Sequence, residues 1–214
     1  MNVAYNMDCL AAMRDMPDNA FDLAVVDPPY GINVANFNMG AGTGKRCSKI
    51  ENRQWIPKDW DSSPPTDEWF SELFRVSENQ IIFGGNYFNL PPCKCFLIWD
   101  KGEGLYGRSF SECEFAWTSL KDTARIFKYS PVDKLRFHPT QKPVALYRWI
   151  YKLYAEPGTK ILDTHLGSGS SRIAAYDAGL DFVGYEIDKE YFDKQEERFE
   201  KHTAQQNLFL MEQI

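Results

Sequence analysis

The stretch "KILDTHLGSGSSRIAAYDAGLDFVGYEID", residues 160–188, decides the fold. A short apolar segment leads into a glycine-rich turn, then into a run of helical composition that Gly179 should stop, and then into a second apolar segment. A strand, a helix and a second strand in this order are typical of an α/β sheet whose strands run parallel. We therefore predict an α/β protein with a mostly parallel sheet and helices on both faces.

The same alternation runs through the remainder of the 214-residue chain. Apolar segments between turn residues predict strands, and apolar residues at helical spacing predict helices, one of them with Thr66 as its N-cap. The predicted strands lie at 21–26, 80–85, 95–100, 113–119, 124–130, 160–163 and 181–187, and the predicted helices at 7–16, 66–77, 142–156, 170–179 and 188–203. This length suits one sizeable core, so we expect a single domain over residues 1–214.

The composition narrows the class of protein. Hydrophobic residues make up 43% of the chain, yet no apolar run reaches membrane-spanning length and the N-terminus shows no signal-peptide pattern, so we expect a soluble, cytoplasmic protein. The five cysteines, an odd number, favour free thiols. Cys93, Cys95 and the three scattered histidines do not supply the four well-spaced ligands of a zinc site, so no metal is predicted.

The charge is unevenly distributed along the chain. The net charge of −6 by itself argues against a nucleic-acid partner. However, residues 31–60 carry five basic against two acidic side chains, and residues 120–143 carry six against two. Two basic segments on an acidic body favour a local phosphate-binding face. From charge alone, two solvated loops are an equally good interpretation.

The glycine-rich turn predicts a site for a nucleoside-containing cofactor. Gly167 and Gly169 allow a ligand to approach the backbone at the start of a helix, and Glu186 ends the next strand where an acidic residue can bind a ribose diol. Arg172 stands at the third glycine position of the dinucleotide fingerprint, which disfavours that class. Asp163 would repel a phosphate but suits an ammonium group, so S-adenosylmethionine (AdoMet) fits. A tight turn without a ligand remains the alternative.

The second informative stretch is "DLAVVDPPYG", residues 22–31. Asp27 follows an apolar strand, so it should lie at the carboxyl edge of the sheet, where ligands bind in open α/β folds. Pro28 and Pro29 stiffen the turn and remove two backbone donors. Tyr30 adds an aromatic ring beside these acceptors. The arrangement suits a planar molecule with an amino group, whereas the alternative is a packing turn that leaves the carboxylate without a purpose.

Three motifs in this order, "DPPY" (27–30), "HPTQKP" (138–143) and "LDTHLGSGSS" (162–171), resemble those of the AdoMet-dependent DNA amino-methyltransferases. The order is that of the permuted beta group, in which the catalytic motif precedes the cofactor loop. DPPY alone has limited specificity, but the three motifs together are strongly specific. The similarity extends over most of the chain, including residues 6–31 and 81–88. It implies a Rossmann-like methyltransferase fold with circularly permuted motif order and a role in DNA methylation, as in restriction–modification.

The resemblance also assigns roles to residues. The catalytic motif is Asp27, Pro28, Pro29 and Tyr30. Asp8 and Cys9 would lie near the adenine of the cofactor, the block 138–143 near its methionine end, and Glu186 at its ribose. The full set of expected cofactor contacts is Asp8, Cys9, Asp27, His138, Thr140, Lys142, Asp163, His165, Leu166, Gly167, Ser168, Gly169, Ser170 and Glu186.

The chain departs from the family pattern in two places. The family commonly has Asp-Pro-Phe where this chain has Asp163-Thr164-His165, and Leu166 is expected to replace the phenylalanine. The segment that would recognise the DNA sequence is short, at 119–137, so the basic loop 31–65 is expected to contribute to DNA binding. The expected DNA contacts are Lys45, Arg46, Lys49, Arg53, Arg125, Lys128 and Arg136, with solvated surface charge as the alternative for about half of them.

The function predicted from these motifs is methylation of the N6 amine of an adenine flipped out of double-stranded DNA. DPPY usually accompanies adenine, and cytosine-N4 enzymes usually carry Ser at the position of Asp27, but the correlation is imperfect. A cytosine-N4 enzyme therefore stays as an alternative, as do an enzyme that methylates RNA or a protein amide, and a catalytically silent binding module. A nucleotide-dependent oxidoreductase is disfavoured by the missing third glycine. By analogy with the family, two copies of the chain could form a homodimer.

Overall fold

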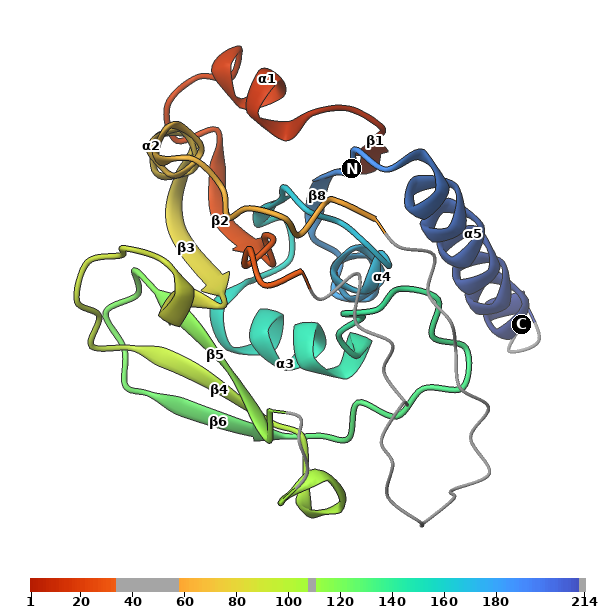
Figure 1. The fold of residues 1–214 in the computed structure, drawn as a ribbon. Coiled ribbons are helices and arrows are strands. Elements are labelled where there is room, and N and C mark those ends of the chain that lie inside the picture. The colour runs from red at the N-terminus through yellow and green to blue at the C-terminus, as the bar shows by residue number, and fades with distance from the viewer. Residues whose placement is uncertain (34–57, 108–110, 212–214) are drawn as a thin grey trace.

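An eight-stranded sheet forms the centre of the part of the chain that the computed structural model describes, residues 1–33, 58–107 and 111–211 (Figure 1). The strands lie in the order β1-β8-β7-β2-β3-β5-β4-β6. The first five run parallel to one another, β5 runs antiparallel to both of its neighbours, and β6 runs parallel to β4. The predicted α/β fold with a mostly parallel sheet is confirmed.

The elements follow one another in the alternation that the sequence predicts. The strands are β1 (Asn2–Tyr5), β2 (Phe21–Val26), β3 (Ser77–Phe83), β4 (Phe96–Asp100), β5 (Cys113–Thr118), β6 (Arg125–Lys128), β7 (Lys160–Asp163) and β8 (Asp181–Tyr185). The helices are α1 (Cys9–Arg14), α2 (Asp67–Val76), α3 (Val144–Tyr154), α4 (Ser170–Asp177) and α5 (Lys189–Met211).

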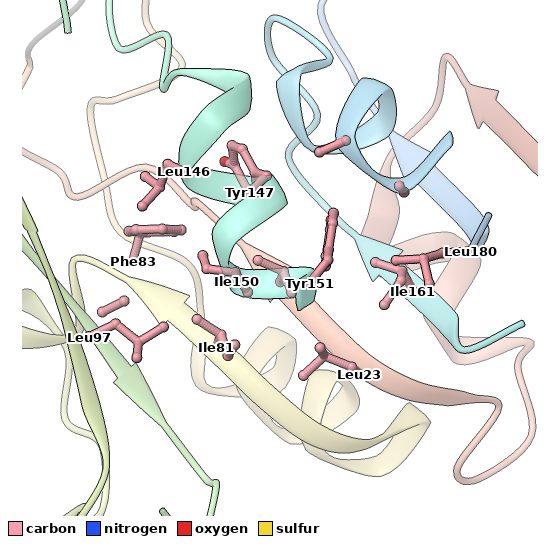
Figure 2. Packing of buried hydrophobic residues seen from close by; sticks show 14 of the residues in the cluster. Leu23, Ile81, Phe83, Leu97, Leu146, Tyr147, Ile150, Tyr151, Ile161 and Leu180 are labelled. Atoms are coloured by element: carbon pink, nitrogen blue, oxygen red, sulfur yellow. The ribbon is translucent and has the colours of Figure 1, made fainter. Parts of the chain in front are cut away.

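Helices cover both faces of the sheet. This follows from the two core clusters between which the buried residues of β2 alternate. Leu23 and Val25 belong to a cluster that includes residues of α3 and α4, and Figure 2 shows Leu23 with Ile81 below the α3 side chains of Ile150 and Tyr151. Ala24 and Val26 belong to the opposite cluster, which includes residues of α1 and α2. A strand buried on both faces is typical of a parallel sheet between helical layers.

Local signals explain where the helices begin and end. The Thr66 hydroxyl accepts a hydrogen bond from the Trp69 amide at 3.3 Å, so Thr66 is the N-cap of α2, as predicted. Pro143, with φ of −70°, occupies the N-cap of α3. Gly179, at φ of +67°, follows α4 and donates its amide to the Tyr176 carbonyl at 3.1 Å. Glycine adopts this left-handed conformation without the Cβ penalty of other residues.

The structure differs from the sequence prediction at several elements. The strand β3 (Ser77–Phe83) begins three residues before the predicted strand 80–85 and ends two residues before it. The strand β1 was not predicted; it lies at the edge of the sheet and pairs with β8 alone. The helix α1 is shorter than the predicted 7–16. It begins after Asp8, which caps it by accepting the Leu10 amide at 2.9 Å, and it ends at Arg14. The last helix continues to Met211, beyond the predicted end at 203.

Two findings concern the expected class of protein. Within the described residues, no helix combines the length and the apolar character that crossing a membrane requires. Cys9, Cys93, Cys95 and Cys113 are free thiols, whereas Cys47 lies outside the described residues.

The core between the sheet and α2 can be tested with Leu73, which is 0% exposed. Replacing Leu73 with alanine should lower the free energy of unfolding by about 2–5 kcal/mol, because a buried cavity is left behind. The matched control is Leu135→Ala at a side chain that is 85% exposed, where the change should stay within about 0.5 kcal/mol. Urea unfolding followed by circular dichroism measures both, and equal effects would contradict the assignment of this core.

Candidate active site

Three carboxylates lie at one edge of the sheet, where parallel strands end. Asp27 follows β2, Asp163 ends β7 and Glu186 follows β8. The strand β7 lies between β2 and β8 and pairs with both in parallel. Two segments far apart in the sequence, the DPPY turn and the glycine loop, therefore lie at neighbouring strand ends.

The carboxylate of Asp27 is held by two donors of the chain. Its Oδ1 accepts a hydrogen bond from the Tyr30 hydroxyl at 2.7 Å, and its Oδ2 lies 2.5 Å from the Lys142 ammonium. Burial raises the pKa of Asp27, and the positive charge of Lys142 opposes that rise. The turn thus presents a carboxylate that is partly enclosed and paired with a cation.

The ring of Tyr30 packs so closely against Gly84 that a side chain at position 84 would not fit beside it. It stacks on Tyr87 with ring centroids 4.9 Å apart and an angle of 15°, and its edge contacts Phe88 at 6.1 Å. A Cβ atom added to Gly84 would lie 2.2 Å from Cε1 of Tyr30, and Gly84 has a φ of +70°. Gly84, which directly follows β3, is therefore required for the position of the Tyr30 ring.

Asp61 fixes the backbone of the DPPY turn from a separate segment. Its Oδ1 accepts the amides of Tyr30 at 2.7 Å and Gly31 at 2.9 Å, and the residue is buried. Because Pro28 and Pro29 have no N–H group, these are the first two amides available after Asp27. Sequence reasoning missed Asp61, since it follows a tryptophan in a stretch without periodicity and belongs to no motif that we singled out.

Lys142 links the HPTQKP segment to the catalytic turn. Besides Asp27, its ammonium lies 3.0 Å from Glu114 Oε2 on β5, and Glu114 Oε1 lies 2.8 Å from the Lys101 ammonium. The Lys142 side chain is 2% exposed. The sequence predicted Lys142 as a cofactor contact, and the structure places it on the carboxylate expected to act in catalysis. Glu114 and Lys101 were not predicted as site residues.

The glycine loop leads directly into α4 and faces Glu186. Gly167 and Gly169 have φ of +51° and +72°, and the Gly167 amide donates to Glu186 Oε2 at 2.8 Å. The other oxygen of Glu186 accepts the Asp188 amide, also at 2.8 Å. On the far side of the loop, Arg198 of α5 donates to the Ser168 carbonyl at 2.8 Å. These bonds hold an extended stretch of loop backbone in one conformation.

Asp163 lies beneath this loop and is 2% exposed. It accepts hydrogen bonds from the Ser171 hydroxyl and, at 3.0 Å, from the His165 amide. Burial raises the pKa of Asp163 to about 7, although both hydrogen bonds oppose the rise. Near neutral pH a cationic ligand is therefore able to shift this carboxyl group to its ionised form.

His138 joins the HPTQKP segment to the glycine loop. A Cβ atom on Gly167 would lie 3.5 Å from His138 Nε2, and the His138 ring packs edge-on against Tyr191 at 4.3 Å. The Nδ1 atom lies 3.2 Å from the Thr140 hydroxyl. Burial, together with nearby positive charges, lowers the pKa of His138 to about 3, so the ring is neutral. The segment from Lys58 reaches the same place, because Trp60 packs on His138 at 5.4 Å.

The remaining expected cofactor residues lie in different surroundings. Cys9 is buried beside Asp8, and burial raises the pKa of its thiol to about 12. Leu166 is buried in the core cluster of α3 and α4. The aromatic group of this turn is His165, whose ring lies 5.4 Å from Trp69. Burial lowers the pKa of His165 to about 4, so a neutral ring occupies the position where the family commonly has phenylalanine. Ser168 and Ser170 contact each other through their hydroxyls at 3.1 Å.

The expected DNA contacts divide into two groups. Lys45, Arg46, Lys49 and Arg53 lie outside the described residues. The other three already have partners within the chain: Arg125 pairs with Asp122 at 3.0 Å, Lys128 pairs with Glu103 at 2.5 Å, and Arg136 donates to the His138 carbonyl at 3.0 Å. The exposed ion pairs of Arg125 and Lys128 contribute little, so they do not prevent an exchange for phosphate groups.

Comparison with known proteins agrees with this geometry. Residues 100–197 match the family described as DNA methylase. The chain is 22% identical to the putative methylase YubD of Escherichia coli K12, over 86% of this chain and 84% of that protein. It is 20% identical to the type II methyltransferase M.HpaI of Haemophilus parainfluenzae, over 90% of this chain and 72% of that protein.

Two solved structures share the fold. The complex of M1.HpyAVI with SAM, another abbreviation of AdoMet, has a TM-score of 0.61 and 20% identity, and the match covers 92% of this chain and all of that one. The PvuII DNA methyltransferase, described as cytosine-N4-specific, has a TM-score of 0.59 and 14% identity, over 95% and 91% of the two chains. The predicted methyltransferase fold is confirmed, and the family match confirms the resemblance to the AdoMet-dependent DNA amino-methyltransferases.

Gly84 offers a test of the catalytic turn. Gly84→Ala should reduce the proposed methyl transfer by about tenfold or more, because the new methyl group would displace the Tyr30 ring and the backbone is in a left-handed conformation. Gly104→Ala is the matched control, since a Cβ there meets nothing within 4 Å. Steady-state rates measure the effect, and circular dichroism checks that both variants fold. Equal rates in the two variants would argue against a role for the Tyr30 position.

Proposed function

We propose that this protein is a DNA methyltransferase that transfers a methyl group from S-adenosylmethionine to the exocyclic N6 amine of an adenine in double-stranded DNA. The observation that carries the proposal is the position of Asp27. Its carboxylate stands on a turn of two prolines, at the sheet edge that also bears the glycine loop and Glu186. The match to DNA methylases supports the reaction class, and the DPPY sequence supports adenine.

The donor set at the sheet edge fits AdoMet. Each oxygen of Glu186 accepts one amide and keeps a further lone pair, which suits a ribose hydroxyl. Asp163 suits the ammonium of an amino acid, because a carboxylate at this strand end would repel a phosphate. Gly167 and Gly169 adopt positive φ, which lets the loop backbone turn sharply at the start of α4. When bound, AdoMet supplies a methyl group activated by a sulfonium.

The role of Asp27 follows from the weak nucleophilicity of the target amine. The lone pair of an adenine N6 amine is delocalised into the ring. Asp27 and the Pro28 carbonyl would accept its two hydrogens, which draws the nitrogen toward tetrahedral geometry and frees the lone pair. The charged acceptor makes the stronger bond and also stabilises the positive charge that develops on the nitrogen. The stiff turn holds these acceptors in position for the transfer.

An adenine inside a duplex cannot reach this turn, so the base must leave the stack. The parallel rings of Tyr30 and Tyr87 offer an aromatic surface for the displaced base. Base–aromatic stacking contributes roughly 1–3 kcal/mol per base in single-strand binders. The basic residues of segments 31–65 and 119–137 are the proposed phosphate contacts.

Cytosine N4 is the second candidate target. The PvuII enzyme, whose fold is similar, is described as cytosine-N4-specific, and both bases offer an exocyclic amine of the same kind. The described geometry of Asp27 and Tyr30 suits either amine.

Nucleoside mass spectrometry separates these targets. The protein is incubated with unmethylated duplex DNA and AdoMet, and the DNA is digested to nucleosides. We expect N6-methyladenine. Formation of N4-methylcytosine would mean that the same mechanism acts on cytosine. If neither product forms although AdoMet still binds, plain duplex DNA is not the substrate.

Asp27→Ala tests the catalytic role directly. Methyl transfer should fall by about 100-fold or more, because the charged acceptor for the amine is lost. AdoMet affinity, measured by isothermal titration calorimetry, should change little. Asp15→Ala, at an exposed aspartate, is the matched control and should behave as the unmodified protein. Full activity of Asp27→Ala would refute the mechanism.

The pKa of Asp163 predicts a pH dependence of AdoMet binding. Because burial raises that pKa to about 7, the group is largely protonated at pH 6 and ionised at pH 8. Pairing with an ammonium favours the ionised form, so affinity should rise with pH, by at most about tenfold per unit. Asp163→Asn should remove the part of the pH dependence that comes from Asp163. Calorimetric titrations at pH 6 and pH 8 compare the AdoMet affinities of the two proteins. An identical pH dependence would contradict the assigned contact.

A further inference from the structure

Four charged side chains form a cluster beside the DPPY turn. Lys142 lies between the carboxylates of Asp27 and Glu114, with nitrogen–oxygen distances of 2.5 and 3.0 Å, and Lys101 pairs with the other oxygen of Glu114 at 2.8 Å. Asp27 lies in the turn after β2 and Glu114 on β5, while Lys142 lies just before α3 and Lys101 directly after β4. Two carboxylates and two ammonium groups leave no net charge in the cluster.

The burial of this cluster makes the partners of Lys142 interdependent. Its side chain is 2% exposed, while those of Asp27 and Glu114 are 16% and 23% exposed. An ammonium group this deeply buried is costly unless carboxylates surround it. If one carboxylate takes another partner, the other must hold the ammonium.

The proposed reaction requires Asp27 to accept a hydrogen bond from a further partner, the target amine. Both of its oxygens already receive a donor: the Tyr30 hydroxyl on Oδ1 and the Lys142 ammonium on Oδ2. The target amine also has to donate to this carboxylate. Lys142 is the donor with a second carboxylate within reach, because an ammonium carries three hydrogens and Glu114 lies 3.0 Å away.

We propose, resting on the proposed methyl transfer, that Glu114 is a positioning residue that retains the Lys142 ammonium when the target amine replaces it on Asp27. In the substrate-free protein, Lys142 thus occupies the place of the target amine. Lys101 holds one oxygen of Glu114 so that the other faces Lys142. The exchange involves hydrogen bonds only, and no covalent bond forms or breaks.

The electrostatics of the cluster agree with this division of roles. Although burial acts in the opposite direction, the charges of Lys142 and Lys101 lower the pKa of Glu114 to about 2, so it remains a charged partner. Among the described residues, Asp27 also interacts with Tyr30 on its own turn, Tyr147 on α3 and Asp163 on β7. The negative charge of Glu114 raises the pKa of Asp27, and the positive charge of Lys142 lowers it.

The test is Glu114→Gln, which keeps the shape and removes the charge. The Lys142 ammonium then has Asp27 as its remaining carboxylate, so kcat on duplex DNA should fall by about tenfold. KM for AdoMet should stay within about twofold, since the substitution affects the contact between Asp27 and the target amine rather than AdoMet binding. The acid limb of the pH–rate profile should move to lower pH, because the charge that raised the pKa of Asp27 is gone.

The matched control is Glu112→Gln, two residues earlier at an exposed position, which should leave kcat and the profile unchanged. Lys142→Met should shift the acid limb the opposite way, to higher pH. A merely structural effect of Glu114→Gln would lower thermal stability or raise KM without moving the limb. Unchanged kcat and an unmoved limb, or a limb that moves to higher pH, would overturn the proposal.

A readout without turnover keeps this inference separate from the proposed function. The side-chain carboxyl signal of Asp27, assigned with Asp27→Asn, is titrated by ¹³C NMR in each protein. Its midpoint should fall in Glu114→Gln and rise in Lys142→Met. If the unmodified protein methylates no DNA but both shifts occur, the proposed function fails while the coupling through Lys142 stands. If the midpoint does not move, the coupling fails whatever the activity.

Discussion

The parallel pairing of β7 with β2 on one side and β8 on the other is the constraint on which the site depends. In this register Ala24 lies opposite Leu162, and Leu162 lies opposite Val183, so the three strands end together. Their following residues then bring Asp27, the glycine loop and Glu186 to one edge. A slip of one residue would exchange the two faces of a strand. The two core clusters, which take alternate residues of β2, oppose such a slip.

The edge concentrates negative charge, and the chain compensates each carboxylate differently. Within the described residues, Asp27 receives a buried ammonium, Glu186 receives two backbone amides, and Asp163 receives a hydroxyl and an amide. Because their surroundings differ, these three carboxyl groups have different pKa values. Because burial keeps His138 and His165 neutral, neither ring adds positive charge to this edge. Asp163, which is 2% exposed and whose described donors are uncharged, is the carboxylate that we propose for a cationic ligand.

Most of the fold could be predicted from local patterns, because each pattern reports the surroundings of its own element. The bounds of β2 agree with the prediction, since its apolar run ends at the turn-forming prolines. The helix α2 begins at the predicted cap of Thr66. The strand β1 was missed because four residues at the sheet edge, only partly buried, carry little hydrophobic pattern. The length of α5 was underestimated, since its charged sequence gives a weak periodic signal.

For the site, the sequence by itself determined the chemical groups and the elements that carry them: a carboxylate on a rigid Pro-Pro turn, a glycine loop before a helix, and acids at strand ends. Only the tertiary structure decided which groups are partners. Glu114, Lys101 and Asp61 belong to no motif that we recognised, and their roles arise from contacts with residues 13 to 31 positions away, which no local pattern records. Burial also set the charge of His138 and the pKa of Asp163, because desolvation depends on everything that packs around a side chain rather than on its neighbours in sequence.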